Sequence, residues 1–189
     1  MNRAFATLVA LIATVIVLTG AVAFTAPALA QTTGPADVTL NELDGSGTDG
    51  DPYIVTTTSE LQAIENDTTA HYRLGNDIDA SATAQWNDGK GFDPIGSFSG
   101  TFDGGGNEIL DLYIDRPSTN NVGLFGSTGS GGRISNVHLE NVSVDGRDYV
   151  GALVGQNQGT IAGSSATGNV TGRNRVGGLI GDMGSKTVS

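Results

Sequence analysis

A short glycine-bearing pattern occurs three times in the second half of this sequence, and it constrains the fold more than any other feature. Residues 122–126, 150–155 and 176–181 each begin with Val-Gly and end with an apolar pair followed by Gly, and the second and third copies have one spacer residue before that pair, which the first lacks. The starting valines are 28 and 26 residues apart. The recurring positions are Val122, Gly123, Leu124, Gly126, Val150, Gly151, Leu153, Gly155, Val176, Gly177, Leu179 and Gly181. Such a period predicts structural units that stack on their neighbours.

Two further pairs of positions keep nearly the same period. Ile134 and Ile161 each follow a glycine-rich turn, and they are 27 residues apart. The tripeptides at 141–143 and 169–171 both have the form Asn-Val-Ser/Thr, 28 residues apart. Each unit contains several short strands and too few apolar residues to form a core alone. The units must therefore stack, with equivalent strands about 4.8 Å apart.

The predicted fold is all-β, a right-handed parallel β-helix (solenoid) with one short N-terminal helix. Thr57 and Glu60 form a capping-box pattern at the start of that helix, and Leu61 and Ile64 supply its apolar face. A propeller or a sandwich is the alternative fold, but both need longer paired strands. The phase of the apolar residues changes between Leu139 and Val142, which predicts a bend.

The repeat also predicts which side chains point inward. We expect Val150, Leu153, Val176 and Leu179 to form rows inside the solenoid. Gly155 and Gly181 are expected at equivalent corners, where a side chain would not fit or φ is positive.

The first thirty residues have the pattern of an export signal. Arg3 precedes an apolar run over residues 4–24, and Ala28-Leu29-Ala30 offers small residues for cleavage before Gln31. The competing interpretation is an uncleaved membrane anchor. The predicted location is extracellular or at the cell surface. The predicted divisions are a signal peptide (1–30), a flexible linker (31–52), the first coils (53–115) and about two and a half repeats, the last incomplete (116–189).

The third copy of the repeat leads to an expectation about the C-terminal coil. After residues 176–181 the sequence contains no counterpart of residues 169–171. We therefore expect the chain to be a piece of a longer array, whose last coil frays or associates end to end.

Composition excludes several classes of partner. The chain has 189 residues and a net charge of −11, and only two of its residues are lysines, Lys90 and Lys186. This charge argues against nucleic acid and anionic membrane surfaces as partners. It suits a high-salt environment, where screening reduces self-repulsion. The chain contains no cysteine, which excludes disulfides, thiol nucleophiles and Cys-ligated metals.

The three Val-Gly copies, each of the first two followed by Gly-x-Ile, resemble the GLUG-motif repeat family. Residues 91–104 resemble the segment that precedes such repeats, and residues 51–79 resemble the family's first coils. The resemblance covers about residues 47–184. It implies a β-helix that occurs in surface adhesins and within much larger bacterial proteases, and it implies no particular catalytic residue.

Motifs for chemistry are sparse. His71 and His138 are the only histidines, and their spacing does not fit a zinc-protease helix. Serine-hydrolase and nucleotide-binding motifs are also missing from the sequence. The predictions are therefore no catalytic residue, no cofactor, no metal and no enzyme activity. The acidic turn at Asp44, Asp49 and Asp51 fits neither calcium motif, so a plain turn is favoured over a calcium site.

Carboxylates support one alternative function. Asp103, Asp111 and Asp115 could share an outer face, as the paired acids of a glycan-cleaving β-helix enzyme would. A solvated acidic surface explains the same residues. Three sequons, at Asn66, Asn141 and Asn169, are possible glycosylation sites. Asn141 and Asn169 are also expected at equivalent turn positions of stacked coils.

The preferred function is a secreted or cell-surface repeat scaffold that acts as a binding, adhesion or spacer module. Its partner is an unknown extracellular protein or glycan; nucleic acid is excluded, and no integral membrane span is expected after leader cleavage. The alternative is a polysaccharide-active β-helix enzyme, a glycoside hydrolase or lyase that uses outward-facing Asp pairs.

Overall fold

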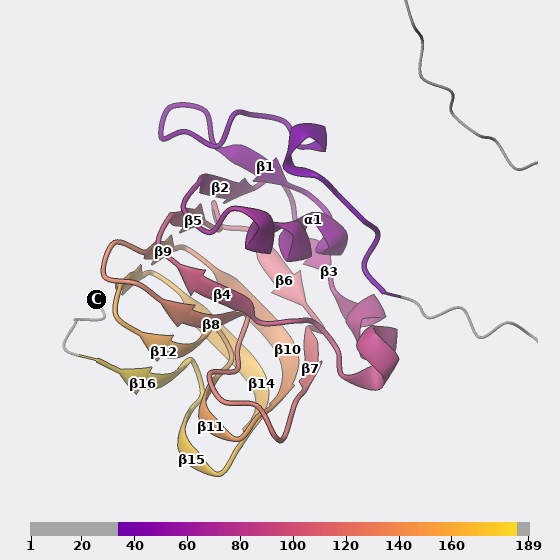
Figure 1. Ribbon diagram of the computed structural model, residues 1–189, viewed down its shortest axis with the longest axis vertical. Helices are drawn as coiled ribbons and strands as arrows, with labels where there is room; N and C mark the ends of the chain where they lie inside the picture. Colours follow the sequence, from indigo (N-terminus) through magenta and orange to yellow (C-terminus); the bar gives the residue numbers. More distant parts are fainter. Residues whose placement is uncertain (1–33, 185–189) are drawn as a thin grey trace, which may run out of the picture. The chain divides into compact units, whose positions relative to one another are not determined.

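The computed structural model describes residues 34–184, which form a parallel β-solenoid of about four turns (Figure 1). The predicted leader lies outside the described residues. Strands from successive coils pair in register, and all pairings between named strands are parallel. Among the described residues, no helix is long and apolar enough to cross a membrane. The fold class predicted from the repeat is confirmed.

The solenoid has three long faces and one short strand pair. The first sheet contains β1 (Tyr53–Val55), β2 (His71–Leu74), β5 (Thr101–Asp103), β9 (Arg133–Ser135) and β13 (Thr160–Ala162). The second contains β3 (Ile78–Asp79), β6 (Glu108–Leu110), β7 (Tyr113–Asp115), β10 (His138–Asp145) and β14 (Ser165–Thr171). The third contains β4 (Ile95–Phe98), β8 (Phe125–Thr128), β12 (Val154–Asn157) and β16 (Ile180–Met183). The short pair is β11 (Asp148–Gly151) with β15 (Asn174–Gly177).

The core is built from rows of side chains that run along the stack. One row on the first sheet consists of Tyr72, Phe102, Ile134 and Ile161, all 1% exposed or less. Aromatic rings concentrate in the earlier coils, where the Phe98 and Phe125 ring centroids lie 4.9 Å apart. Alternation along each strand sends every second side chain inward, so the apolar rows fill the interior. Burial of these rows is the main favourable contribution to folding.

The second face bends at residues with left-handed backbone. Asp111 has a φ of 56° and Asn141 a φ of 54°, and the pairing between β10 and β14 shifts register between Leu139 and Val142. The bend predicted from the apolar phase is therefore present. A simple alternation through Leu110 and Leu112 would place both inside, but Ile109 is fully buried and Leu110 is only half-buried. Asp111 reverses the phase because it adds a bend between β6 and β7.

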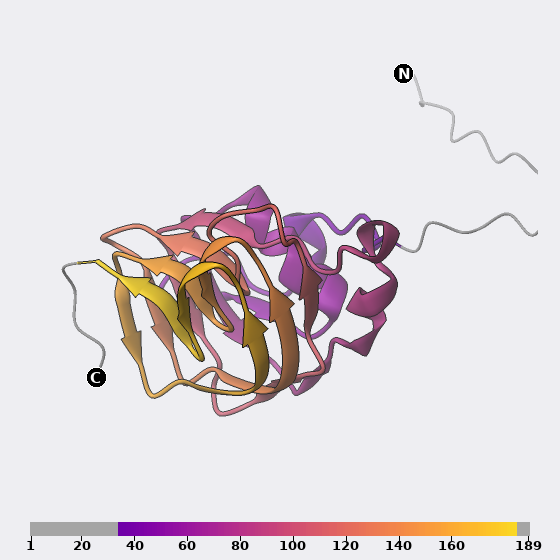
Figure 2. The same ribbon diagram turned by 90° about the horizontal axis from the view of Figure 1, so that it is seen from below.

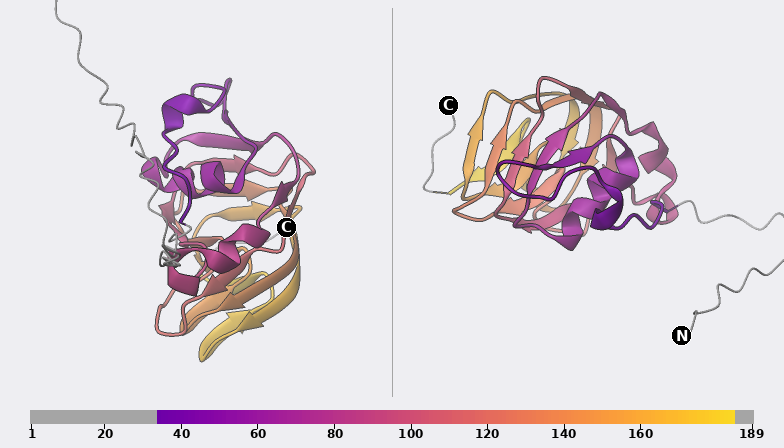
Figure 3. Two further views of the ribbon diagram at one scale, coloured as in Figure 1. Left: turned by 90° about the vertical axis from the view of Figure 1, so that its right-hand side faces the viewer. Right: turned by 90° about the horizontal axis from the view of Figure 1, so that it is seen from above.

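Helical segments cover the N-terminal end. The helix α1 (Thr58–Ala63) begins at Thr57, whose side chain accepts a hydrogen bond from the Glu60 amide, as the capping box predicts. Four 3-10 helices accompany it: η1 (Leu40–Glu42), η2 (Ile64–Asn66), η3 (Ser81–Gln85) and η4 (Asn87–Gly89). Leu61 and Ile64 are fully buried against the first coils. In the view from above, α1 lies at the end of the stack that faces the viewer (Figure 3).

The segment before β1 also packs on the first coil. Leu43 is 7% exposed, and the amide of Ile54 donates to the carbonyl of Asp44 over 2.8 Å. The His71 amide donates to the Gly47 carbonyl in the same way. At the opposite end, β15 and β16 form the last described coil, which Figure 2 shows from outside without a helix across it.

Candidate functional site

The repeated glycines allow two segments of backbone to approach each other closely. A Cβ on Gly151 would lie 2.5 Å from the carbonyl oxygen of Val154, and one on Gly155 would lie 2.7 Å from that of Tyr149. Gly181 is equally crowded, with the Val150 amide nitrogen 2.4 Å from the position of a Cβ. No side chain fits at these positions, which explains why the motif needs glycine. Gly155 and Gly181 lie within β12 and β16 rather than at corners, and neither has a positive φ.

The left-handed residue of the motif is the one before each repeated valine. Asn121, Tyr149 and Arg175 have φ values of 57°, 61° and 52°. Three different side chains adopt this uncommon conformation at equivalent positions. The Arg175 guanidinium lies 5.1 Å from the centroid of the Tyr149 ring, so the side chains of neighbouring coils also stack outside.

The repeated apolar residues differ in burial between copies. Val122, Leu124, Val150 and Leu153 are all fully buried. Val176 pairs in register with Val150 but is 42% exposed, and Leu179 is half-buried. These residues of the third copy face the interior row, but no described coil follows them. The first copy is one residue shorter than the second, and the pairing distance between them accordingly changes from 28 residues at Val122 to 29 at Phe125.

The three sequons occupy different environments. Asn66 is exposed at the end of η2. Asn141 is exposed, but its amide group donates a hydrogen bond to the Asp111 carboxylate. Asn169 pairs with Ser143 and lacks a positive φ, so the expected equivalence with Asn141 is wrong. The pairing distance falls from 27 residues at Leu139 to 26 at Val142, whereas the two sequons are 28 residues apart in the sequence.

The three aspartates expected on one face are separated. Asp103 lies on the first sheet, where its carboxylate accepts hydrogen bonds from the Gly105 amide and the Asn136 side chain. Asp115 lies on the second sheet, and Asp111 is at the bend between β6 and β7. The bend breaks the strand parity on which the expectation rested. Within residues 34–184, no group of three His, Cys, Asp or Glu side chains could hold a metal ion.

Both histidines lie on strands of the outer surface. The His71 Nδ1 is 3.6 Å from an Asp49 carboxylate oxygen, and the His138 Nδ1 is 2.9 Å from the Ser165 hydroxyl. Each contact joins neighbouring segments of the stack, which is a structural role.

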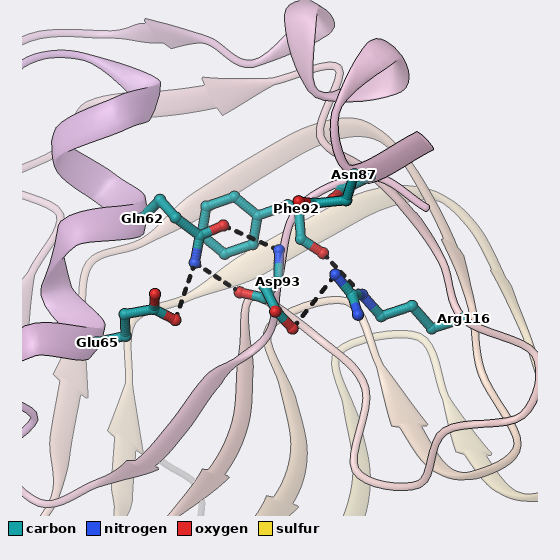
Figure 4. Close-up of polar contacts among 7 residues, drawn as sticks. Gln62, Glu65, Asn87, Phe92, Asp93 and Arg116 are labelled. Atoms are coloured by element: carbon teal, nitrogen blue, oxygen red, sulfur yellow. Dashed lines mark hydrogen bonds and ion pairs between the residues drawn. The ribbon is translucent and has the colours of Figure 1, made fainter. Parts of the chain in front are cut away.

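A cluster of polar residues joins helix α1 to two loops, and the sequence gives little sign of it. We call Gln62, Glu65, Asp93 and Arg116 the polar bridge (Figure 4). The Gln62 amide nitrogen donates to the Asp93 carbonyl and its oxygen accepts from the Asp93 amide, both over 2.9 Å. The Gln62 side chain thus pairs with the Asp93 backbone through two hydrogen bonds, as neighbouring strands pair. This pairing fixes the loop that contains Asp93 against α1. Gln62 is 5% exposed, and its polar atoms require such partners.

Arg116 extends the polar bridge to the second loop. Its Nε donates to the Phe92 carbonyl over 3.2 Å, and its Nη2 lies 3.3 Å from the Asp93 carboxylate (Figure 4). The Asn87 side chain supports the loop that contains Phe92 and Asp93, because it donates a hydrogen bond to the Gly91 carbonyl over 2.7 Å. Residues from separate coils thus form one connected network, which is why sequence spacing does not reveal it.

Two open hollows share lining residues with the polar bridge. One of about 340 Å³ is lined by residues 35–39 and by residues of α1 and η2, including Gln62 and Glu65. The other, of about 430 Å³, is lined by Lys90 and residues 115–119, including Arg116. Hydroxyl, amide, carboxylate and basic groups all border these hollows. Such a surface offers hydrogen bonds to a polar ligand.

The carboxylates of the polar bridge are electrostatically distinct. Glu65 is exposed as a residue, but partial burial of its carboxyl raises the pKa of that group, and the nearby Asp93 carboxylate raises it further. The Arg116 guanidinium and the hydrogen bond from Gln62 act in the opposite direction. The Asp93 carboxylate faces the Arg116 cation directly. The Glu65 carboxyl therefore retains its proton to higher pH than an ordinary glutamate does, whereas the Asp93 carboxylate is ion-paired with Arg116.

The fold and its repeated glycine motif define a parallel β-solenoid repeat protein. Residues 146–171 match the family described as the GLUG motif, and the chain is a GLUG-motif repeat protein. The match spans one full coil from the glycine before β11 to the end of β14. The resemblance inferred from the glycine repeats is therefore confirmed.

Similar proteins are far longer than the region they share with this chain. Halomucin from Haloquadratum walsbyi is 48% identical over 149 residues, which cover 72% of this chain and 2% of halomucin. A Gly-rich membrane protein of Evansella cellulosilytica is 36% identical over 126 residues, 62% of this chain and 14% of that protein. A crystal structure of an immunoglobulin A1 protease-like protein from Bacteroides ovatus is 19% identical, with a TM-score of 0.40 over 75% of this chain and 64% of that one.

Proposed function

We propose that this chain is a solenoid module of a secreted or cell-surface protein, which spaces its neighbours and binds an extracellular glycan or protein. The observation that carries the proposal is the 48% identity to halomucin over most of the described solenoid. The name halomucin denotes a mucin, and mucins are proteins of the cell exterior. A stack of short coils suits this role because it extends without needing a large separate core.

The charge and the leader support the same location. The net charge of −11 keeps an exposed surface soluble at high salt, where screening limits repulsion. The proposal includes export through residues 1–30 and cleavage before Gln31. N-terminal sequencing of the protein recovered from producing cells tests it, and we expect a chain that begins at Gln31. Protease treatment of intact cells should release peptides from residues 34–184, and their complete protection would contradict a surface location.

The polar bridge and its two hollows are the proposed ligand surface. Its side chains offer donors and acceptors, and the volumes of the two hollows fall within the range of about 300–1,000 Å³ that is typical of protein sites for small ligands. A glycan array probed with the full chain tests the proposal. Binding to one class of polysaccharide is expected.

Substitutions within this surface make the test specific. Glu65→Gln and Lys90→Gln change exposed side chains that border the two hollows, so the fold should persist. We expect each to weaken glycan binding by about tenfold, the loss of one charged hydrogen bond. Ser97→Ala, on the exposed surface of β4, is the matched control. Unchanged affinity in both glutamine variants would rule out this surface.

The alternative function is a polysaccharide-active enzyme. The arrangement of two carboxyl groups, Glu65 and Asp93, at the polar bridge favours it, because glycosidases use a pair of carboxyl groups. Release of reducing sugar from acidic and neutral polysaccharides tests this alternative. Activity that Glu65→Gln abolishes would establish an enzyme, whereas binding without sugar release favours the binding module.

A further inference from the structure

One of the two hollows at the polar bridge is distinguished by its cations. We call the hollow of about 430 Å³ that is lined by Lys90 and residues 115–119 the Lys90 hollow. Without Arg3 and Lys186, which lie outside residues 34–184, the chain has seven lysines and arginines against 20 aspartates and glutamates. Two of these seven cations line the Lys90 hollow, whereas the described residues that line the other hollow include two acids and no cation. The two hollows therefore suit groups of different charge.

Lys90 is available to a ligand at this hollow. The Asp115 amide donates a hydrogen bond to the Lys90 carbonyl over 2.9 Å, which holds the end of η4 beside the loop that follows β7. The Lys90 side chain is exposed, and it forms no ion pair with any residue in the described part of the chain. On a chain with such an excess of carboxylates, an unpaired ammonium group at a hollow offers a binding partner to a negative charge.

Arg116 places a second cation at the same hollow, and it is anchored from one side. Its side chain is only 15% exposed, and its Nη2 lies 3.3 Å from the Asp93 carboxylate. Its Nε donates to the Phe92 carbonyl over 3.2 Å (Figure 4). These contacts engage two of the three guanidinium nitrogens, and within the described residues they leave the donors of Nη1 for a ligand or water. The guanidinium is therefore already oriented before a ligand binds, which lowers the entropic cost of binding.

The other groups that line the Lys90 hollow suit the hydroxyls of a sugar. The Asp115 carboxylate accepts hydrogen bonds, and the hydroxyls of Ser118 and Thr119 both donate and accept them. Two backbone hydrogen bonds hold this loop in place: the Thr119 amide donates to the Arg116 carbonyl over 2.8 Å, and the Arg147 amide donates to the Thr119 carbonyl over 2.7 Å. The hollow thus combines two cations with a set of neutral and acidic hydrogen-bonding groups on a fixed loop.

We propose that the Lys90 hollow binds an acidic sugar unit, whose carboxylate or sulfate group lies between the Lys90 ammonium and the Arg116 guanidinium. Asp115, Ser118 and Thr119 bind the hydroxyls of the same unit. This inference rests on the proposed function, and it names the class of glycan that the ligand surface selects. The net charge of −11 repels an anion at a distance, but the Debye length is about 3 Å at 1 M salt, so that groups in direct contact determine binding there.

Isothermal titration calorimetry of the full chain in 1 M NaCl, with matched oligosaccharides, tests the proposal. Oligogalacturonate is compared with its methyl ester, and a sulfated oligogalactan with its desulfated form, because each change removes the negative charge and keeps the sugar ring. We expect one charged form to bind at least tenfold more tightly than its neutral counterpart, and the pair that shows this difference identifies carboxylate or sulfate as the anion.

Two results would overturn the inference, and they differ in what they say of the proposed function. Equal affinity for the charged and neutral members of both pairs would leave a glycan-binding module without an anion site. Binding of none of the four would exclude the acidic sugar, and the glycan array then decides separately whether the chain binds glycan.

A matched pair of variants connects the preference to this hollow. Lys90→Gln removes a charge from an exposed side chain, so the fold should persist by circular dichroism. We expect it to reduce the preference for the charged form about tenfold and to change the affinity for the neutral form little. Arg133→Gln, at an exposed side chain of β9 without an ion pair among the described residues, removes the same charge from the first sheet and should keep the preference. A preference that is unchanged in Lys90→Gln, or reduced equally in both variants, would show that the Lys90 hollow does not bind the anion.

Discussion

The two ends of the described solenoid solve the same physical problem differently. At the N-terminal end, α1 and the segment before β1 cover the first coils, so that Val55, Leu61 and Ile64 are fully buried. At the other end, Val176 and Met183 remain exposed although they continue buried rows. A coil of this fold is thus stabilised mainly by what lies on either side of it, and much less by its own residues.

The second and third copies of the motif make this difference quantitative, because their sequences are nearly the same. Val150 and Val176 are paired in register, yet one is fully buried and the other is 42% exposed. Sequence identity between repeats therefore does not imply equal energetic roles. Substitutions at matched positions can measure how much one covering coil contributes.

The largest expected effect is at this matched pair. Val150→Asp should destabilise the chain by about 4 kcal/mol or more, because it buries an unpaired charge in the stacked core. Val176→Asp should cost less than about 1 kcal/mol, since water reaches the side chain. Urea denaturation of both variants checks the comparison. Similar losses would mean that the last coil is covered as completely as the one before it.

Glycines give the next largest effect. Gly151→Ala would place a Cβ 2.5 Å from the Val154 carbonyl oxygen, and we expect a loss of about 2–4 kcal/mol from the forced backbone shift. Gly178→Ala is the control within the third copy, because no heavy atom lies within 4 Å of its Cβ position. It should be neutral or stabilise by up to about 1 kcal/mol. Thermal melts of the two variants measure the difference, and equal melting temperatures would refute the close-approach account of the motif.

The smallest expected effect is a pH dependence that links the last two coils. Hydrogen bonds from Arg173, Asn174 and Arg147 lower the pKa of Asp148 to about 2. The carboxylate therefore favours the folded state above its unfolded pKa of about 3.9, and this contribution is lost as the pH falls from about 4 to about 2. Asp148→Asn should flatten the stability profile over that range, measured by denaturation at each pH.

An exposed aspartate provides the control for this prediction. Asp88→Asn, at a side chain without an ion pair among the described residues, should keep the wild-type slope. A slope that is the same in Asp148→Asn and the wild type would mean that the Asp148 cluster does not stabilise the last coils.

The stacking was predictable because glycine and valine recur at positions where geometry allows little choice. The register of Ile134 with Ile161 and the change of spacing after Gly123 both follow from the sequence. The pairing of Asn169 with Ser143, in place of Asn141, could not be predicted from the sequence. The bend at Asn141 depends on a left-handed residue, and Asn, Asp, Tyr and Arg all occupy such positions here, so no single residue type marks them.

The polar bridge was harder to predict for a different reason. Gln62 lies between the apolar residues Leu61 and Ala63 on α1, which is the one local sign of a buried polar contact. Its partners Asp93 and Arg116 come from later loops, and only the stacking of coils brings them together. Capping, by contrast, was predictable because Thr57 and Glu60 are three residues apart.

Amide hydrogen exchange of a dilute monomer tests most directly whether each coil is stabilised by its covering neighbour. We expect strong protection in β11 and β12, which have coils on both sides, and exchange at least tenfold faster in β15 and β16. The paired positions Val154 and Ile180 give the clearest comparison, because their strands are in register. Equal protection of the two pairs of strands in the monomer would contradict the account.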